Sequence, residues 1–249
     1  MMQFEKKLER PPYVHNWVRN IGSDPESTIK RLVALALGFP VKTYGAANYI
    51  LVDRIVRSLD RATAMKAALT TGRINSRDIV AEYVSAFYEY DEIRGYSGKP
   101  TYDEMVEPFR IGKGLFVPVK PLVNIVENGK LVPIFSVGWA TFPLTQFQMR
   151  LLATVLEDAV FSLADFKMSP GEFICFPKEG KKPDAIRKPL VWKRGDVTLL
   201  SQGELRDCLD MYLEALEAAK AILRDMPQKT EQPSKRNPSP DPDQLGWDL

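Results

Sequence analysis

Three arginines recur at intervals of three and four residues within a stretch of helical periodicity. Arg54, Arg57 and Arg61 would therefore lie on one face of a helix, and guanidinium groups aligned on a rigid element are suited to contact the phosphates of a nucleic acid. Asp53 and Asp60 are close to them in the sequence and could neutralise them instead. The spacing leaves two interpretations open: an anion-binding face, or a face that meets solvent or a partner protein.

The distribution of charge is compatible with an anionic partner. The formal net charge of the chain is only +2, yet residues 1–80 hold 13 Lys and Arg against 7 Asp and Glu, and residues 173–200 hold 7 against 3. These net charges of +6 and +4 would form one basic surface if the fold brought the two blocks together; otherwise they belong to solvated faces. The residues expected to bind nucleic acid are Arg54, Arg57, Arg61, Arg73, Arg77, Lys181, Lys182, Lys193 and Arg194.

Residues 62–82 also have the layout of a helix-turn-helix unit, with a glycine-containing turn at Thr71–Asn75 and Arg77 near the start of the second helix. Helical hairpins of this kind are common in helical domains, and the second helix offers no evident set of base-contacting side chains. The layout therefore does not by itself indicate that the protein reads DNA.

Acidic side chains offer an enzymatic alternative. Glu157, Asp158, Asp165 and Glu172 could hold the magnesium ion of a nuclease, provided that the fold brings them into one cleft. Such a centre usually places an acidic residue and a lysine two apart on a strand. Asp165 and Lys167 instead fall at the expected end of a helix, where a separation of two turns side chains to different sides.

Residues for nucleophilic or metal chemistry are scarce. The chain has one histidine, His15, and two cysteines, Cys175 and Cys208, whereas a catalytic triad or a structural zinc site needs several such side chains together. Neither cysteine has a histidine beside it in the sequence, and the common phosphate-binding glycine loops do not occur. We therefore expect no catalytic residues, no metal site and no cofactor, and a binding protein rather than an enzyme.

The end of the chain differs in composition from the rest. Residues 226–249 include five prolines and few apolar side chains, which predicts a disordered tail. Leu245, Trp247 and Leu249 stand near its end among acidic residues, and an aromatic anchor in such a segment is typical of a docking motif. We expect these three residues to bind a partner protein.

Helix signals dominate the first part of the chain. Ser23-Asp24-Pro25-Glu26 combines a capping side chain with a proline in the first turn, so a helix begins there. A second helix is expected over residues 46–69, and a third begins at Asn75 or Ser76. These helices would form a helical part over residues 1–107, net basic up to residue 80.

A β-hairpin is the strongest signal of the second part, over residues 121–136. Asn128–Gly129 separates two apolar runs, and both residues accept the positive φ that a two-residue turn requires. This turn pairs Glu127 with Lys130 and leaves both faces of the hairpin apolar, which places it inside a layered domain. Pro133 cannot donate a hydrogen bond, so a bulge or an unpaired edge is expected there.

The remaining elements complete an α+β domain over residues 108–225. A long apolar helix is expected over residues 144–166, and a capping box at Ser201–Glu204 opens the last helix. Short strands are expected at 172–176, 190–192 and 197–199, with a mobile polar loop at 177–189. The fold class is α+β: a helical N-terminal part, then a small mixed or antiparallel sheet with a central hairpin, packed with two long helices.

The last helix carries apolar residues at 205, 209, 212, 216, 219 and 223. This spacing is that of a coiled-coil seam, but a stripe docked within the same chain looks identical in sequence. We favour docking within the chain, and a homodimer through residues 205–223 is the alternative.

No apolar run of about 18 residues occurs, as a membrane-spanning helix would need, and the basic N-terminus lacks the apolar stretch of a secretory signal. We therefore expect a cytoplasmic protein without membrane contact. The expected function is that of a non-enzymatic binding or adaptor protein, which contacts nucleic acid or an acidic partner through its basic faces and a second protein through its tail. The alternatives are a metal-dependent, nuclease-like enzyme built on carboxylates and a structural homo-oligomer built through the last helix.

Overall fold

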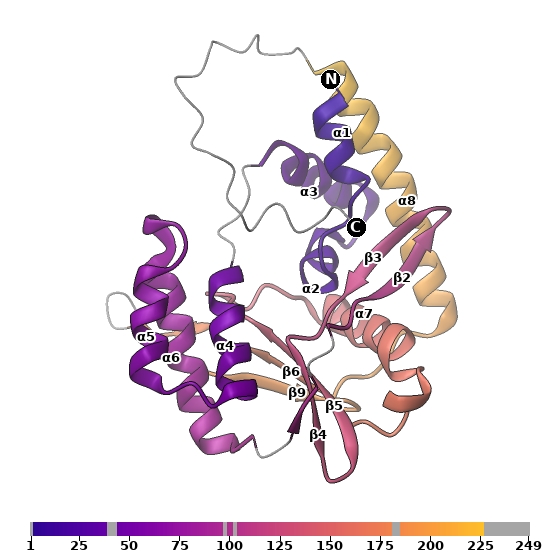
Figure 1. Ribbon diagram of the computed structural model, residues 1–249. Helices are drawn as coiled ribbons and strands as arrows, with labels where there is room; N and C mark the ends of the chain where they lie inside the picture. The colour runs from indigo at the N-terminus through magenta and orange to yellow at the C-terminus, as the bar shows by residue number, and fades with distance from the viewer. Residues whose placement is uncertain (1, 39–43, 97–98, 102–103, 181–184, 227–249) are drawn as a thin grey trace.

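The computed structural model describes residues 2–38, 44–96, 99–101, 104–180 and 185–226 (Figure 1). In these residues five strands form a central sheet in the order β1–β4–β5–β6–β9. Neighbouring strands are antiparallel, except that β5 and β6 are parallel. The bounds of the strands are Lys99–Pro100, Val123–Glu127, Lys130–Val137, Glu172–Cys175 and Leu190–Lys193. The α+β class predicted from the sequence is confirmed.

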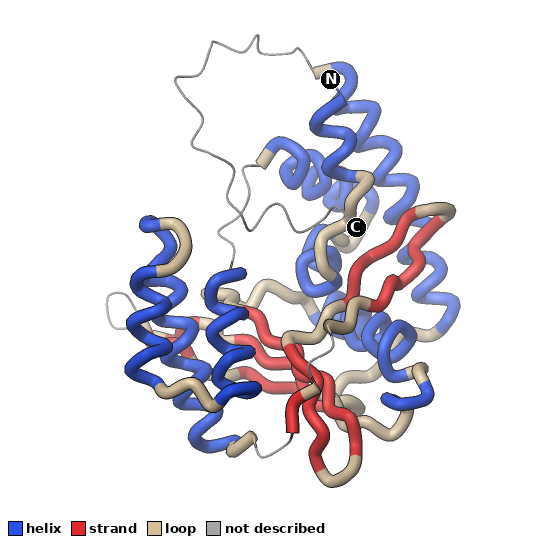
Figure 2. Tube along the Cα trace, in the orientation of Figure 1, coloured by secondary structure: helices blue, strands red, loops and turns tan. Residues whose placement is uncertain are grey.

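Helices cover both faces of this sheet, as Figure 2 shows with the sheet in red between two groups of blue helices. One face packs against α4 (Gly45–Arg57), α5 (Arg61–Thr70) and α6 (Arg77–Arg94), which follows the short 3-10 turn η2 (Ile74–Ser76). The core on this side is built from aliphatic and aromatic side chains, among them Leu51, Val84, Phe87, Ile125, Ile134 and Ile174.

The opposite face of the sheet packs against α7 (Gln146–Leu156), which continues into a π-helical segment (Glu157–Phe161) and a short 3-10 turn (Ala164–Phe166). The long helix α8 (Gln202–Asp225) lies on this side and packs on α3 (Pro25–Leu37). The same core includes residues of α1 (Met2–Leu8), α2 (Val14–Trp17), the 3-10 turn η1 (Val18–Asn20) and a separate hairpin, β2 (Glu107–Gly112) and β3 (Leu115–Val119). The contacts between α3 and α8 cross the domain boundary expected near residue 107.

The central hairpin forms in the predicted register. Glu127 pairs with Lys130 and Val123 pairs with Ile134, and the turn residues Asn128 and Gly129 have φ values of 52° and 74°. Of the two alternatives expected at Pro133, the bulge is wrong, because Asn124 and Pro133 pair without a shift of register. The other alternative, an unpaired edge, fits the side towards β6, where the pairing begins at Ile134. Since hydrogen-bonded and non-bonded pairs alternate from the turn, Pro133 occupies a non-bonded position towards β4, where its missing N–H is not needed.

Three other predictions are corrected. The helix expected over residues 46–69 is two helices, because Ser58 adopts a left-handed conformation with φ of 55° and Asp60 caps a new helix. The helix expected over residues 144–166 ends as an α-helix at Leu156, and no strand forms at 197–199. The loop expected at 177–189 contains the two-stranded hairpin β7 (Lys178–Glu179) and β8 (Ile186–Arg187); its residues 181–184 lie outside the described residues.

The predicted caps at the starts of α3 and α8 are confirmed. Asp24 accepts a hydrogen bond from the Ser27 amide, and Ser201 and Glu204 form the capping box. The apolar stripe of α8 is docked within the chain, with Tyr212 and Leu216 buried against α3 and its neighbours. A homodimer through residues 205–223 therefore lacks support. Among the helices of the described residues, none combines the length and the apolar character needed to cross a membrane.

Candidate functional site

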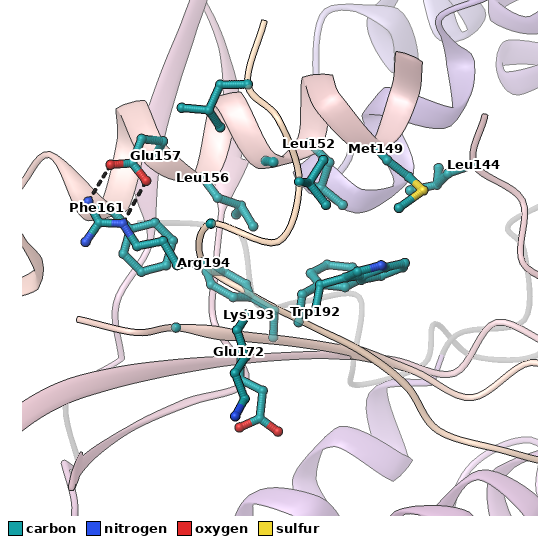
Figure 3. Close-up of a pocket in the computed structure, with 17 residues that line it drawn as sticks. Leu144, Met149, Leu152, Leu156, Glu157, Phe161, Glu172, Trp192, Lys193 and Arg194 are labelled. Carbon is teal, nitrogen blue, oxygen red and sulfur yellow. Dashed lines mark hydrogen bonds and ion pairs between the residues drawn. The ribbon is translucent and has the colours of Figure 1, made fainter. Parts of the chain in front are cut away.

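A pocket lies between α7 and the sheet, beside the edge strand β9 (Figure 3). Its cavity volume is about 60 Å³. The sheet, α7, the π-helical segment and the segment after β9 all contribute to its walls. The lining residues are Phe135, Leu144, Met149, Leu152, Ala153, Leu156, Glu157, Phe161, Gly171, Glu172, Phe173, Trp192, Lys193, Arg194, Gly195, Val197 and Leu199.

The wall on the sheet is a row of three aromatic side chains from three adjacent strands. Phe135 of β5 pairs with Phe173 of β6, which pairs with Trp192 of β9. Side chains at paired positions project to the same face of a sheet, and the ring centroids are 6.4 Å and 5.3 Å apart along this row. These are contact distances for aromatic pairs, so the wall is continuous.

The wall on α7 comes from residues with helical spacing. Met149, Leu152 and Leu156 are three and four residues apart and therefore share one face of the helix. The backbone then changes to π-helical geometry at Glu157–Phe161, which turns Phe161 into the pocket lining as well. Single π-helical turns inside α-helices occur frequently at functional sites.

Gly171 fixes the position of the Phe161 ring. The residue has a φ of 58°, and a Cβ atom added there would lie 2.3 Å from Cζ of Phe161. Both facts require glycine, since other residues rarely adopt this conformation and non-bonded carbon atoms do not approach so closely. The pocket thus depends on a close approach between the loop before β6 and the π-helical segment.

An ion pair closes one end of the pocket. Nε of Arg194 donates to Oε2 of Glu157 at 2.8 Å, and the second guanidinium nitrogen donates to Oε1. The guanidinium lies 4.7 Å from the centroid of the Phe161 ring. Its Nη1 also donates to the backbone carbonyls of Phe166, Lys167 and Ser169 at 3.4, 2.6 and 3.1 Å. Arg194 therefore ties three segments together, and its charge is already compensated.

The other charged residues at the lining face away from the cavity. Figure 3 shows the side chains of Glu172 and Lys193 pointing away from the pocket. Glu172 accepts hydrogen bonds from Tyr90, from Tyr96 at 3.1 Å and from Nε of Arg94 at 3.1 Å, on the side of the sheet covered by α6. Burial and the Glu172 carboxylate raise the pKa of both tyrosines above its usual range. The interior of the pocket is consequently apolar.

The outer rim of the pocket is the segment after β9. Its turn is held by the Lys193 amide, which donates to Asp196 at 2.8 Å. Two hydrogen bonds attach its end to α7: Arg150 donates to the Leu199 carbonyl at 3.0 Å, and the Leu200 amide donates to Thr154 at 2.8 Å. Leu199 lines the pocket while it is 42% exposed. The pocket therefore reaches the surface beside this segment.

The three arginines of the predicted stripe are each paired with a carboxylate. Arg54 donates to Asp91 at 2.6 Å and Arg57 to Asp53 at 2.9 Å, while Arg61 donates to Glu89 at 2.9 Å. Because the helix breaks at Ser58, Arg61 belongs to α5 and not to α4. The shared helix face expected from the spacing is therefore wrong.

The other residues expected to bind partners are scattered. Arg77 begins α6, and Arg73 precedes the turn η2. Lys193 and Arg194 lie at and after the end of β9, on the edge of the sheet. Lys181 and Lys182, and the tail residues Leu245, Trp247 and Leu249, lie outside the described residues. Arg54 and Arg194 make their ion pairs on opposite sides of the sheet, so the structure does not bring these two together.

The helix-turn-helix layout forms, but its second helix is buried. The helix α6 packs against α4, α5 and the sheet, with Tyr83, Val84 and Phe87 inaccessible to solvent. A recognition helix has to enter a DNA groove. The packing of α6 removes the structural basis for that role.

The four carboxylates considered for a metal site do not converge. Glu157 pairs with Arg194, whereas Glu172 is held on the opposite side of the sheet. Asp158 and Asp165 are exposed. Within the part of the chain that the structure describes, no three His, Cys, Asp or Glu residues are grouped so that they could hold a metal ion.

The histidine and the cysteines are placed as packing residues. His15 lies between Tyr13 and Trp139, with ring centroids 6.1 Å from each. Loss of solvent, together with the charge of Arg19, lowers the pKa of His15 to about 4. Burial raises the pKa of the Cys175 thiol to about 12 and that of Cys208 to about 11, so both thiols are protonated at neutral pH.

Sequence reasoning did not find the pocket. Phe173 and Trp192 were placed on the expected strands, but their alignment depends on the parallel pairing of β5 with β6, which no local signal specifies. Phe135, Phe173 and Trp192 would lie on one face if their three strands were neighbours. The presence of an aromatic residue on each of these strands was therefore a usable signal. The chain matches no model of a known protein family, and a search of curated proteins found no relative.

Proposed function

We propose that this protein is a non-enzymatic binding protein, and that its pocket beneath α7 binds a small, uncharged apolar group. The observation that supports this proposal is a concave apolar site, lined by Phe135, Phe173 and Trp192, with its one inward-facing ion pair satisfied within the chain. Pockets with largely apolar and aromatic walls are the usual binding sites for small ligands.

The size of the cavity limits the ligand. One water molecule needs roughly 10–15 Å³ on the scale used for such cavities, so about 60 Å³ holds a few water-sized groups. A single aromatic ring system or a branched alkyl group is of this size. The aromatic row favours a flat ring, because offset stacking on Phe173 and Trp192 adds roughly 0.5–1.5 kcal/mol for each ring pair beyond the burial of apolar area.

The chemistry of the lining favours binding over catalysis. Among the described residues that line the cavity, none carries a hydroxyl, a thiol or an imidazole group. The Glu157 carboxylate accepts two hydrogen bonds from Arg194 and is therefore occupied. We accordingly retain the proposal of a binding protein, and a cytoplasmic location remains part of that proposal.

A filled pocket tests this function. Ala153 is half-buried and lines the cavity, so Ala153→Phe should occupy it from the α7 side. Ala221 is exposed on α8, and Ala221→Phe makes the same change away from the pocket. With indole as the probe, calorimetry or saturation-transfer NMR should give saturable binding to the parent and to Ala221→Phe, and none to Ala153→Phe. Equal binding by all three proteins would refute the proposed function.

Contact of the basic faces with nucleic acid stays a proposal with weaker support. Its main residues Arg54, Arg57 and Arg61 are already paired with carboxylates, and pairing lowers the counterion release that drives phosphate binding. Absence of binding to labelled duplex and single strands at low salt would refute it. Recruitment of a protein by the tail is likewise a proposal, since its residues lie outside the described part of the chain.

A further inference from the structure

We propose that the occupant of the pocket is the end of this same chain, with Trp247 as the group that enters and with Leu245 and Leu249 against the rim. The inference rests on the proposed function, because it requires the cavity beneath α7 to be a binding site. Two features of the molecule support this docking: an apolar cavity of about 60 Å³, and a tryptophan flanked by leucines at residues 245–249.

The length of the chain permits this docking. Helix α8 begins at Gln202, three residues after the rim residue Leu199, and continues for 24 residues to Asp225. At about 1.5 Å per residue, the helix carries the chain roughly 36 Å away from the rim. Trp247 follows 21 residues after Met226, and an extended chain spans up to about 3.3 Å per residue, or roughly 70 Å. The extended chain from Met226 to Trp247 is therefore about twice as long as the distance along α8 back to the rim.

The chemistry of the chain end fits the cavity. An indole ring is flat and largely apolar, and the wall opposite α7 is the aromatic row of Phe135, Phe173 and Trp192. Gly246 directly precedes Trp247 and has no side chain to obstruct a close approach of the backbone to the rim. Leucines stand two residues to either side of the tryptophan, and the rim offers the exposed apolar side chain of Leu199.

Because Trp247 belongs to the same chain as the pocket, even a weak affinity would keep the pocket mostly occupied. A tethered segment has an effective concentration in the millimolar range when the tether can span the two sites. Five prolines in residues 227–249 reduce the number of backbone conformations available to the tether. A pocket that binds a free indole with a dissociation constant of about 0.1 mM would then be roughly 90% occupied by Trp247. External ligands would have to displace it.

Disulfide trapping in the full-length chain tests the contact directly. Leu199→Cys with Leu245→Cys should form an intramolecular disulfide, because Cα atoms must come within about 7 Å for the bond to close. Leu37→Cys with Leu245→Cys is the matched control, since Leu37 is 43% exposed against 42% for Leu199 and lies on α3, which packs on α8. The native cysteines are buried and should not compete. The expected cross-linking rate at Leu199 is roughly tenfold above the control, and adding Ala153→Phe should return it to the control rate.

Indole binding separates the failure of this inference from the failure of the proposed function. Trp247→Ala in the full-length chain should bind indole roughly tenfold more tightly than the parent, because the pocket is no longer occupied. Equal affinities, with binding still removed by Ala153→Phe, would overturn the tail proposal and leave the function intact. Absence of pocket binding in both proteins would overturn both. A disulfide that forms between two copies, in proportion to concentration, would also overturn docking within one chain.

Discussion

The close approach of Gly171 to Phe161 predicts an unusually damaging glycine-to-alanine substitution. Gly171 has a φ of 58°, and an added Cβ atom would lie 2.3 Å from Cζ of Phe161. Ordinary contact between carbon atoms is about 3.5–4.0 Å, so the ring would have to move by more than about 1 Å. The movement would push Phe161 into the cavity or against Arg194, whose guanidinium lies over the ring.

Two contributions set the expected size of the effect. Placing alanine in the left-handed region costs about 1–2 kcal/mol, and forcing extra volume into a packed site typically costs about 1–3 kcal/mol more. The free energy of unfolding of Gly171→Ala should therefore fall by about 2–5 kcal/mol. Gly114 has a φ of 73° and nothing within 4 Å of an added Cβ. Gly114→Ala should show the first contribution alone.

Urea denaturation of the parent and both variants measures the difference. Phe161→Leu combined with Gly171→Ala adds a stricter condition: the shorter side chain removes the clash, so the two substitutions together should destabilise less than the sum of their separate effects. If Gly171→Ala loses no more stability than Gly114→Ala, then Phe161 is not held in place by the loop before β6. The pocket wall would then not depend on the contact between Gly171 and Phe161.

Two further predictions concern the turn and the histidine. Gly129→Val should lower the free energy of unfolding by about 1 kcal/mol or more, because Gly129 has a φ of 74° and β-branched residues resist it; Lys130→Val beside it is the control in urea denaturation, and equal midpoints would contradict the prediction. The pKa of His15 falls to about 4 in the fold from about 6.5 in an unfolded chain. The unfolded state therefore binds more protons between these values, and stability should decrease as the pH falls from 6.5 towards 4, by at most about 1.4 kcal/mol per pH unit. His15→Gln should flatten this part of a stability-against-pH curve, and an unchanged slope would show that other groups produce it.

Features that depend on neighbouring residues could be predicted from the sequence. The hairpin at Asn128–Gly129 formed in register because the turn itself fixes which residues pair. The caps at Asp24 and Ser201 formed because each needs only the residue three positions ahead. The buried character of β5 on both faces followed from its uninterrupted apolar run.

Features that depend on distant residues could not be predicted. Periodicity continued through Ser58, yet a left-handed residue there divides the helix, because α4 and α5 both have to pack on α6. The pocket required three strands to align, and the parallel pairing of β5 with β6 joins residues almost 40 positions apart.

The basic and acidic blocks of the sequence do not form separate charged surfaces in the fold where their side chains pair with each other. Residues 1–80 carry a net charge of +6 and residues 81–110 carry −4, with 3 Lys and Arg against 7 Asp and Glu. In the fold these blocks are partners: Arg54 pairs with Asp91, and Arg61 pairs with Glu89 and Glu92 of α6. Blocks of opposite charge that suggested a basic surface thus pair with each other across the packed helices α4, α5 and α6. The exposed pairs contribute little stability, but they leave Arg54 and Arg61 compensated by carboxylates. The apolar pocket is therefore a better candidate binding site than these arginines.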